Sequence, residues 1–354
     1  IMIHNKEKQK TAVSMQTALD RTALVISRRR ALGVLAVATL GVLSGRSAAA
    51  SPPVQWRGIV LGAPATITLH HPDRARAEVA LSAVLSEIDA LESIFSLFRA
   101  GSALSRLNRL GELDPAPDSL LQVLNCCRDL HNASDGTFDP TVQPLWAVYA
   151  EHYGRVAATA EGPSEAILHA ALQQVGFRRV VRDGLSLRCH GTQLTLNGIA
   201  QGYLTDRARD ILAAHGLPHA LINLGEFRAL GPRPDGSAWR IAISHPEVPW
   251  RRLAEVQLPA GAALATSAAM GTAFDSSGRH HHLFDPRTGH SVQGWRSVTV
   301  QAAHATLADG LSTALAVATP ADAAHILAQF PGTGALLLGQ DKKLHNLGKR
   351  LTVA

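Results

Sequence analysis

Residues Thr192–Tyr203 read T-Q-L-T-L-N-G-I-A-Q-G-Y, and this stretch joins a strand pattern to a helix pattern without a break. Alternating Thr and Leu residues over Thr192–Leu196 predict a strand. Gly198 and Gly202 mark a turn, after which a helix is expected to run to about Gly216. A strand that passes through a turn straight into a helix indicates a fold that mixes both elements.

The turn itself is a candidate ligand site. Its two glycines let the backbone of residues 197–202 approach a ligand closely, and the amides at a helix N-terminus favour a phosphate group. The stretch matches neither the G-x-G-x-x-G nor the G-K-[ST] fingerprint of nucleotide-binding loops. An ordinary tight turn is therefore the alternative interpretation.

The flanking sequence extends the same mixed pattern. Upstream, apolar residues at three- and four-residue spacing predict a helix over Asp73–Phe98, and Asp183-Gly184 predicts a hairpin turn between two short strands. Downstream, strands are expected at 219–224, 239–244, 253–258, 280–285, 296–302 and 335–339, and helices at 306–318 and 321–329. Strands and helices do not alternate regularly and no internal repeat is visible, which predicts a single α+β domain.

The first 50 residues resemble an export signal and not part of the fold. Ser27–Gly33 carries a twin-arginine pattern, an apolar run follows over Ala31–Leu43, and Ala48-Ala49-Ala50 offers a cleavage site. A single membrane anchor is the alternative, but the run is shorter than the ~20 residues that a spanning helix needs. We expect a cleaved signal peptide at 1–50, a folded domain at 51–354 and a periplasmic location.

The charge balance changes once this segment is set aside. The whole chain has a net charge of +6, and residues 1–50 contain eight Lys/Arg against two acidic residues, so 26 basic residues balance 26 acidic ones in the remainder. No basic patch argues for nucleic acid. The three cysteines, Cys126, Cys127 and Cys189, form neither a disulfide framework nor a zinc spacing.

Asp309 and Thr313 are candidate metal ligands. They stand four residues apart at the start of an apolar helix, so a carboxylate and a hydroxyl share one helix face. Both are hard oxygen donors of the kind that Mg²⁺ takes, usually with few protein ligands beside substrate phosphates. The alternative is that Asp309 simply interacts with the helix dipole or caps the helix.

Two further segments contain reactive side chains. Asp135–Thr141 combines turn residues, two carboxylates and a phenylalanine, and can equally be a surface turn. His280-His281-His282 suggests a metal site, but consecutive strand residues alternate faces, so the three imidazoles cannot all reach one ion. A single inward-facing histidine acting as a proton acceptor is the alternative interpretation.

Taken together and in this order, these segments resemble the ApbE family of FAD:protein FMN transferases. The twin-arginine leader and Asn223–Gly231 look specifically like the NosX branch, whose members assist nitrous oxide respiration. The matching segments cover nearly all of the chain after residue 50: Phe95–Phe98 with Ser102–Asn108, Ser134–Thr141, Gly198–Tyr203, Ala265–Ser267, His282–Gly289 and Ala308–Ala314.

The resemblance implies a T-fold-like α+β domain that binds FAD as substrate together with Mg²⁺. A Thr or Ser hydroxyl of an acceptor flavoprotein would attack the FMN-side phosphorus, and AMP would leave. By the resemblance, Asp309, Thr313 and the backbone carbonyl of Gly198 hold the metal, and His282 with Asp309 is catalytic. The flavin nucleotide would be contacted by Leu61, Phe98, Thr137, Phe138, Asp139, Thr195, Gln201 and Leu264.

Several positions depart from the usual pattern of the family. A charged residue is common where Thr195 and Gln201 stand, and some members have a second acidic ligand where Ser312 stands. The sequence also has Ala268 after Thr266-Ser267 where glycine is usual, and Gly225-Glu226 in place of a glycine pair. Fewer charges around the metal would lower its affinity.

The resulting hypothesis is an FMN transferase that acts on a periplasm-facing flavoprotein. By the resemblance, this partner is a NosR-type membrane protein. The transferase would contact the membrane only through this partner. A second enzyme class, FAD pyrophosphatase, would use water in place of the acceptor hydroxyl. A non-enzymatic alternative is a flavin or copper carrier for nitrous oxide reductase that uses the histidine triplet.

Overall fold

An eight-stranded antiparallel sheet lies at the centre of the protein, with strand order β1-β2-β6-β7-β10-β11-β12-β13. The computed structural model describes residues 52–156 and 158–353, so the predicted signal peptide lies outside the described residues. The strands are β1 (Val54–Val60), β2 (Ala63–His70), β6 (His219–Asn223), β7 (Phe227–Leu230), β10 (Ala263–Ala268), β11 (Trp295–Ala302), β12 (Gly334–Gly339) and β13 (Leu344–Gly348).

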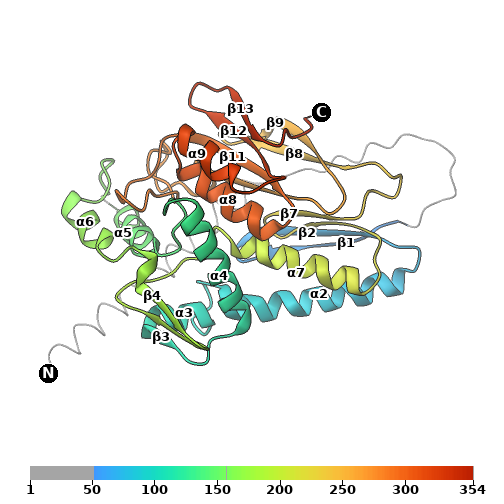
Figure 1. Cartoon of the computed structure of the whole chain (residues 1–354), viewed down its shortest axis with the longest axis horizontal. Helices are drawn as coiled ribbons and strands as arrows, with labels where there is room; N and C mark the ends of the chain where they lie inside the picture. The colour runs from blue at the N-terminus through green and yellow to red at the C-terminus, as the bar shows by residue number, and fades with distance from the viewer. Residues whose placement is uncertain (1–51, 157, 354) are drawn as a thin grey trace.

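Helices cover one face of this sheet, as Figure 1 shows for α2, α7 and α8. The helices are α2 (Arg74–Phe95), α3 (Ala103–Leu110), α4 (Asp118–Ala133), α5 (Gln143–Tyr153), α6 (Glu165–Leu172), α7 (Ala200–Ala214), α8 (Ala305–Val317) and α9 (Pro320–Ala328). Ile67, Leu204, Val298 and Leu311 from both layers are buried in one apolar core. Because α8 lies inside this core, nearly all of its residues are buried, including Asp309.

Helix α2 illustrates how local sequence sets an element's bounds. Asp73 accepts a hydrogen bond from the Arg76 amide and begins the helix, as an N-cap should. The predicted helix extends to Phe98, but the observed one ends at Phe95 because Ser96 takes an extended conformation. The Ser96 hydroxyl then accepts bonds from the amides of Phe98 and Arg99, which stabilises the turn away from the helix.

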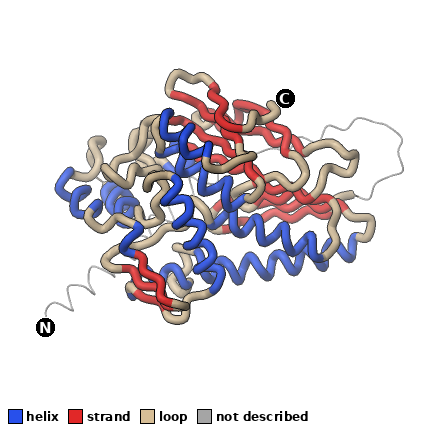
Figure 2. Tube along the Cα trace, in the orientation of Figure 1, coloured by secondary structure: helices blue, strands red, loops and turns tan. Residues whose placement is uncertain are grey.

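The opposite face of the sheet is covered by a hairpin of β8 (Trp239–His245) and β9 (Val248–Leu258). Trp239, Ile241 and Val256 of the hairpin pack with Ala229 and Leu264 of the large sheet. Strand β9 begins earlier than the predicted 253–258. The large sheet therefore has apolar residues buried on both sides. Figure 2 shows the helices gathered along one side of the strands.

A smaller region completes the domain. A three-stranded sheet contains β3 (Glu112–Leu113), β4 (Val180–Asp183) and β5 (Ser186–Cys189), and two 3-10 turns, η1 (Phe177–Arg179) and η2 (Ala269–Thr272), connect longer elements. The predicted Asp183-Gly184 hairpin is confirmed, with Asp183 paired to Ser186. The prediction of a single mixed α+β fold is also confirmed.

The predicted strand at Thr192–Leu196 is wrong, although its alternation is real. Thr192, Leu194 and Leu196 are buried and the residues between them are less so, but no neighbouring strand of the described residues pairs with them. Instead, the side chain of Asn108 bonds Leu194 in the manner of a strand, accepting from its amide at 2.7 Å and donating to its carbonyl at 2.8 Å. The period-two pattern thus reports one-sided burial, and a side-chain amide replaces the partner strand.

The predicted strand at 280–285 is also wrong. His281 and Phe284 form only isolated bridges, to Ala273 and Ser291 respectively, and Asp285 accepts the amides of Thr288 and Gly289 in a turn. The local sequence Asp285–Gly289 folds back on itself before a ladder can form. Over residues 52–156 and 158–353, the helices are all too short or too polar to cross a lipid bilayer.

Candidate active site

A cavity of about 1250 Å³ lies where the beginning of α7 and the middle and end of α8 meet β10 and the 135–141 turn. All of the residues predicted for the site line it except Phe98, which lies half-exposed in the loop after α2. The predicted residues that line the cavity are Leu61, Thr137, Phe138, Asp139, Thr195, Gly198, Gln201, Leu264, His282, Asp309 and Thr313. The fold therefore gathers segments that are far apart in the sequence into one site.

Close contact between α7 and α8 places the candidate metal ligands beside the glycine turn. The Gly202 amide donates to Oδ2 of Asp309 at 2.9 Å. A Cβ at Gly202 would lie only 2.3 Å from the Ala305 carbonyl oxygen, and a Cβ at Gly198 would lie 2.8 Å from Oγ1 of Thr313. Gly202 is needed because a Cβ there would meet the backbone of α8, and a Cβ at Gly198 would crowd the side chain of Thr313.

Residues from β10 hold the α8 face in place. Ser267 Oγ lies 2.7 Å from Ser312 Oγ and 3.4 Å from Thr313 Oγ1, and Ser312 donates to the backbone carbonyl of Asp309 at 2.9 Å. Ser312 is fully buried and does not line the cavity. It therefore supports the helix and does not take the place of a second anionic ligand.

A second carboxylate, Glu226, faces the same cavity as Asp309. It lies between β6 and β7, is buried, and accepts the amide of Thr266 at 3.1 Å. Burial, and next the nearby charge of Asp309, raise the pKa of Glu226 well above its ordinary range. The sequence signalled this residue only as a departure from a glycine pair, because nothing local showed that residue 226 would face residue 309.

The electrostatics of the pair favour a bound cation. Burial raises the pKa of Asp309 to about 7, although the Gly202 amide works in the opposite direction. None of the ion pairs formed in the described part of the chain includes Asp309 or Glu226. Two buried carboxylates without a basic partner there, beside the hydroxyl of Thr313, match the hard oxygen donors that Mg²⁺ takes, so the residues present fit such an ion.

The three consecutive histidines point to different surroundings. His281 is buried and its Nε2 lies 2.7 Å from the Val292 carbonyl oxygen, whereas His280 packs against the rings of Tyr149 and Tyr153. Of the three, His282 lines the cavity. Its Nδ1 lies 3.1 Å from the Thr272 carbonyl oxygen, which can only accept, so a neutral His282 carries its hydrogen on Nδ1 and its lone pair on Nε2.

The 135–141 turn is rigidly attached to the site. Asp139 is buried, and its oxygens accept from the amide and hydroxyl of Thr141 and from the Phe177 amide. Thr137 donates its hydroxyl to the Ala314 carbonyl of α8 at 3.2 Å. These bonds make the turn a fixed wall of the cavity, so the role of Asp139 in the structure is to hold the turn.

The remaining cofactor candidates form other parts of the wall. Leu61 occupies the β1–β2 turn with a positive φ of 48°, and its amide donates to Glu92. Thr195 donates its amide to Pro140, and Leu264 is buried in β10 opposite Phe227. Gln201 packs its side chain against Gly225. Together they give the cavity apolar and polar surfaces of the kind that small-molecule sites use.

Comparisons with known proteins agree with this arrangement. A model of the ApbE family matches residues 61–337. The FAD:protein FMN transferase of Treponema pallidum is 30% identical over 337 residues, covering 88% of this chain and 92% of the relative. That of Vibrio cholerae is 30% identical over 292 residues, covering 80% of this chain and 86% of the relative.

Solved structures show the same fold. The apo form of the Pseudomonas stutzeri flavinyl transferase ApbE superposes with a TM-score of 0.71 at 28% identity, covering 85% of this chain and 97% of that one. The ApbE protein of Thermotoga maritima gives a TM-score of 0.73 at 26% identity, covering 83% of this chain and 97% of that one. The fold is that of the flavinyl transferases. The chain belongs to the ApbE family, as the sequence motifs predicted.

Proposed function

We propose that this protein is a Mg²⁺-dependent FAD:protein FMN transferase that attaches FMN to a Thr or Ser of an acceptor flavoprotein. Membership of the ApbE family supports a flavin transferase. The observation that carries the metal dependence is the placement of Asp309 and Thr313 against the Gly198 turn inside one large cavity. A helix N-terminus and a cation at this point would together receive the phosphates of FAD.

The residues have separate tasks in this reaction. Asp309, Thr313 and the backbone of Gly198 would hold Mg²⁺, which supplies charge neutralisation to the phosphates when it is bound. The acceptor oxygen forms a bond to the FMN-side phosphorus as the bond from that phosphorus to the AMP oxygen breaks. AMP departs with the electron pair of that bond, and Nε2 of His282 takes the proton of the acceptor hydroxyl. The fixed 135–141 turn and Leu264 orient the flavin half.

The cellular setting is a further part of the proposal. The twin-arginine pattern and cleavage site at 1–50 support export to the periplasm. The similarity of Asn223–Gly231 to the NosX branch supports a role in maturation of the nitrous oxide reduction system, with a NosR-type membrane protein as acceptor. Membrane contact would then be made only through that partner.

The test is a transfer assay with the chain that begins at residue 51. Incubation with FAD, Mg²⁺ and a candidate acceptor domain should give covalent flavin fluorescence on the acceptor in a denaturing gel. Chelation of the metal, or Asp309→Ala, should abolish the label. Free FMN without labelled acceptor would instead indicate an FAD pyrophosphatase, and unchanged FAD would indicate a carrier.

A control addresses the histidine triplet. His280→Ala removes a ring that does not itself line the cavity and should leave transfer intact. If copper binding were the function, the double variant His280→Ala with His281→Ala would no longer bind copper, whereas Asp309→Ala would still bind it. Retained transfer in Asp309→Ala would overturn the assignment of the metal site.

A further inference from the structure

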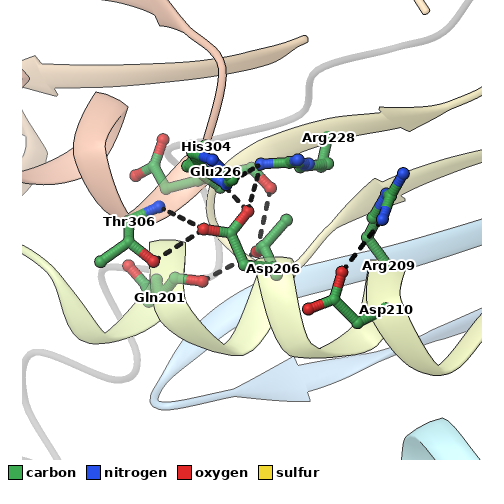
Figure 3. Close-up of polar contacts among 10 residues, drawn as sticks. Gln201, Asp206, Arg209, Asp210, Glu226, Arg228, His304 and Thr306 are labelled. Carbon is green, nitrogen blue, oxygen red and sulfur yellow. Dashed lines mark hydrogen bonds and ion pairs between the residues drawn. The ribbon is translucent and has the colours of Figure 1, made fainter. Parts of the chain in front are cut away.

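The carboxylate of Asp206, in the middle of α7, binds the first turn of α8 (Figure 3). Its Oδ1 accepts the amide of Ala305 at 2.8 Å, and its Oδ2 accepts the amide and hydroxyl of Thr306 at 2.9 and 2.7 Å. The residue that precedes α8, His304, makes no side-chain cap bond of its own to this helix. The cap of α8 therefore comes from a different helix, about 100 residues away in the sequence.

The bond from Gly202 to Asp309 runs in the opposite direction between the same two helices. On α7, Gly202 and Asp206 are four residues apart, and on α8, Ala305 and Asp309 are also four residues apart. Each helix thus donates a backbone amide to a carboxylate of the other, at 2.9 Å for Gly202 and 2.8 Å for Ala305. We call this pair of contacts the reciprocal clamp.

Arg228 of β7 supplies the positive charge that the clamp needs. Its side chain is 6% exposed, and Nη1 lies 2.5 Å from Oδ1 of Asp206 and 3.4 Å from Nδ1 of His304. Its Nε is among the buried described atoms without a hydrogen-bond partner. A guanidinium buried in this way would be strongly unfavourable without Asp206.

The reciprocal clamp sets the distance between α7 and α8, and the cation site depends on this distance. The Gly198 turn begins α7, and Thr313 and Asp309 lie on α8, so the site exists only where the two helices meet. Asp206 and Arg228 do not line the cavity themselves. Apart from the charge of Asp206, which adds to burial in raising the pKa of Asp309, any effect they have on the cation site passes through the position of α8 against α7.

We propose that Asp206 is a positioning residue for the cation site, with Arg228 as its counter-charge. This inference rests on the proposed Mg²⁺-dependent transfer. An amide in place of the Asp206 carboxylate keeps one acceptor oxygen and turns an NH₂ group toward the donors of α8 or Arg228. The first turn of α8 is then held less firmly against the Gly198 turn, so Asp309 and Thr313 no longer meet the ion in one arrangement. Removal of groups that orient metal ligands typically costs about 10–100-fold in metal affinity or activity.

The test uses Asp206→Asn and a matched control, Asp210→Asn. Asp210 lies one turn further along α7, is exposed and pairs with its neighbour Arg209 in the same view (Figure 3). The Mg²⁺ dissociation constant is measured by calorimetry with the metal alone, and FAD affinity is measured separately by fluorescence quenching. We expect Asp206→Asn to weaken Mg²⁺ binding by about tenfold or more while FAD affinity stays at the control value.

A second variant separates positioning from stability. In Asp206→Asn with Arg228→Met the unpaired buried charge is gone, so thermal stability should recover, but the cap of α8 is still weakened and Mg²⁺ binding should remain poor. Mg²⁺ affinity equal to that of Asp210→Asn in either variant would overturn the inference. A wild-type chain that binds FAD but no Mg²⁺ would overturn the proposed metal site itself, which is a distinct result.

Discussion

Glu226 and Asp309 are two buried carboxylates that line one cavity, and burial together with the charge of Asp309 raises the pKa of Glu226. They reach the cavity from different elements, Glu226 from the β6–β7 connection and Asp309 from α8. Because burial and a neighbouring like charge both disfavour the ionised form of Glu226, a bound cation would lower the cost of ionising the pair. The relationship leads to two predictions about charge.

Glu226→Gln should stabilise the metal-free protein and weaken its affinity for Mg²⁺. Burial and the charge of Asp309 both disfavour the ionised form of Glu226, and a neutral amide removes that cost as the pH rises. In alkaline solution we expect the Tm to rise by about 2–4 °C, the shift that ~1 kcal/mol gives in a domain of this size. Thermal unfolding with and without Mg²⁺ measures both effects. Glu112→Gln, at an exposed position on β3, is the control and should change neither. A lower Tm without metal would contradict the prediction.

Mg²⁺ affinity should increase with pH through the titration of Asp309. Burial raises the pKa of this carboxyl from 3.8 to about 7, so it is mostly neutral in mildly acidic solution and must lose its proton to bind a cation. The same raised pKa contributes stability to the metal-free protein that is fully present below about pH 4 and is lost as pH rises through about 7. Calorimetry at several pH values measures the effect, and Asp309→Asn is expected to bind Mg²⁺ poorly at every pH.

The sequence predicts the parts of the site whose signals are local. Asp309 and Thr313 share a helix face by spacing, and Gly198 and Gly202 indicate that the backbone is approached closely at the turn. Asp206 and Glu226 carry no local signal, because their partners are far along the chain: Asp206 caps a helix about 100 residues away. On sequence alone, Asp206 is an ordinary acidic residue within an amphipathic helix.

The incorrect strand at Thr192–Leu196 has the same origin. Alternation reports which side chains are buried but not what satisfies the backbone, and here Asn108 supplies those bonds from 86 residues away. His282 presents the reverse case, since alternation correctly indicates that the three histidines diverge even though the segment is not a strand. Burial patterns are therefore predictable from the sequence, whereas distant hydrogen-bond partners are not.

Gly202→Ala should separate the two helices that form the site. The added Cβ would lie 2.3 Å from the Ala305 carbonyl oxygen and 2.8 Å from Cβ of Asp309, and a backbone atom cannot move aside as a side chain can. We expect a destabilisation of about 1–3 kcal/mol, typical of overpacking, together with weaker Mg²⁺ binding. Denaturant unfolding and calorimetry provide the measurements. Gly101→Ala, where a Cβ would meet no atom within 4 Å, should have neither effect.

His282→Asn should remove the proton acceptor while leaving substrate binding intact. The contact of Nδ1 with the Thr272 carbonyl fixes the ring so that Nε2 carries the lone pair, and an asparagine amide can still donate to that carbonyl but has no basic nitrogen. Loss of a general base lowers kcat by about 10²–10⁴-fold, so transfer should slow by that factor at unchanged FAD and Mg²⁺ affinity. The pH profile of the rate should change shape in His282→Asn, which a purely structural role of His282 would leave unaltered. Since His281 is buried and bonded to Val292, it cannot take over the task, and wild-type turnover in His282→Asn would mean that the acceptor hydroxyl loses its proton to another group.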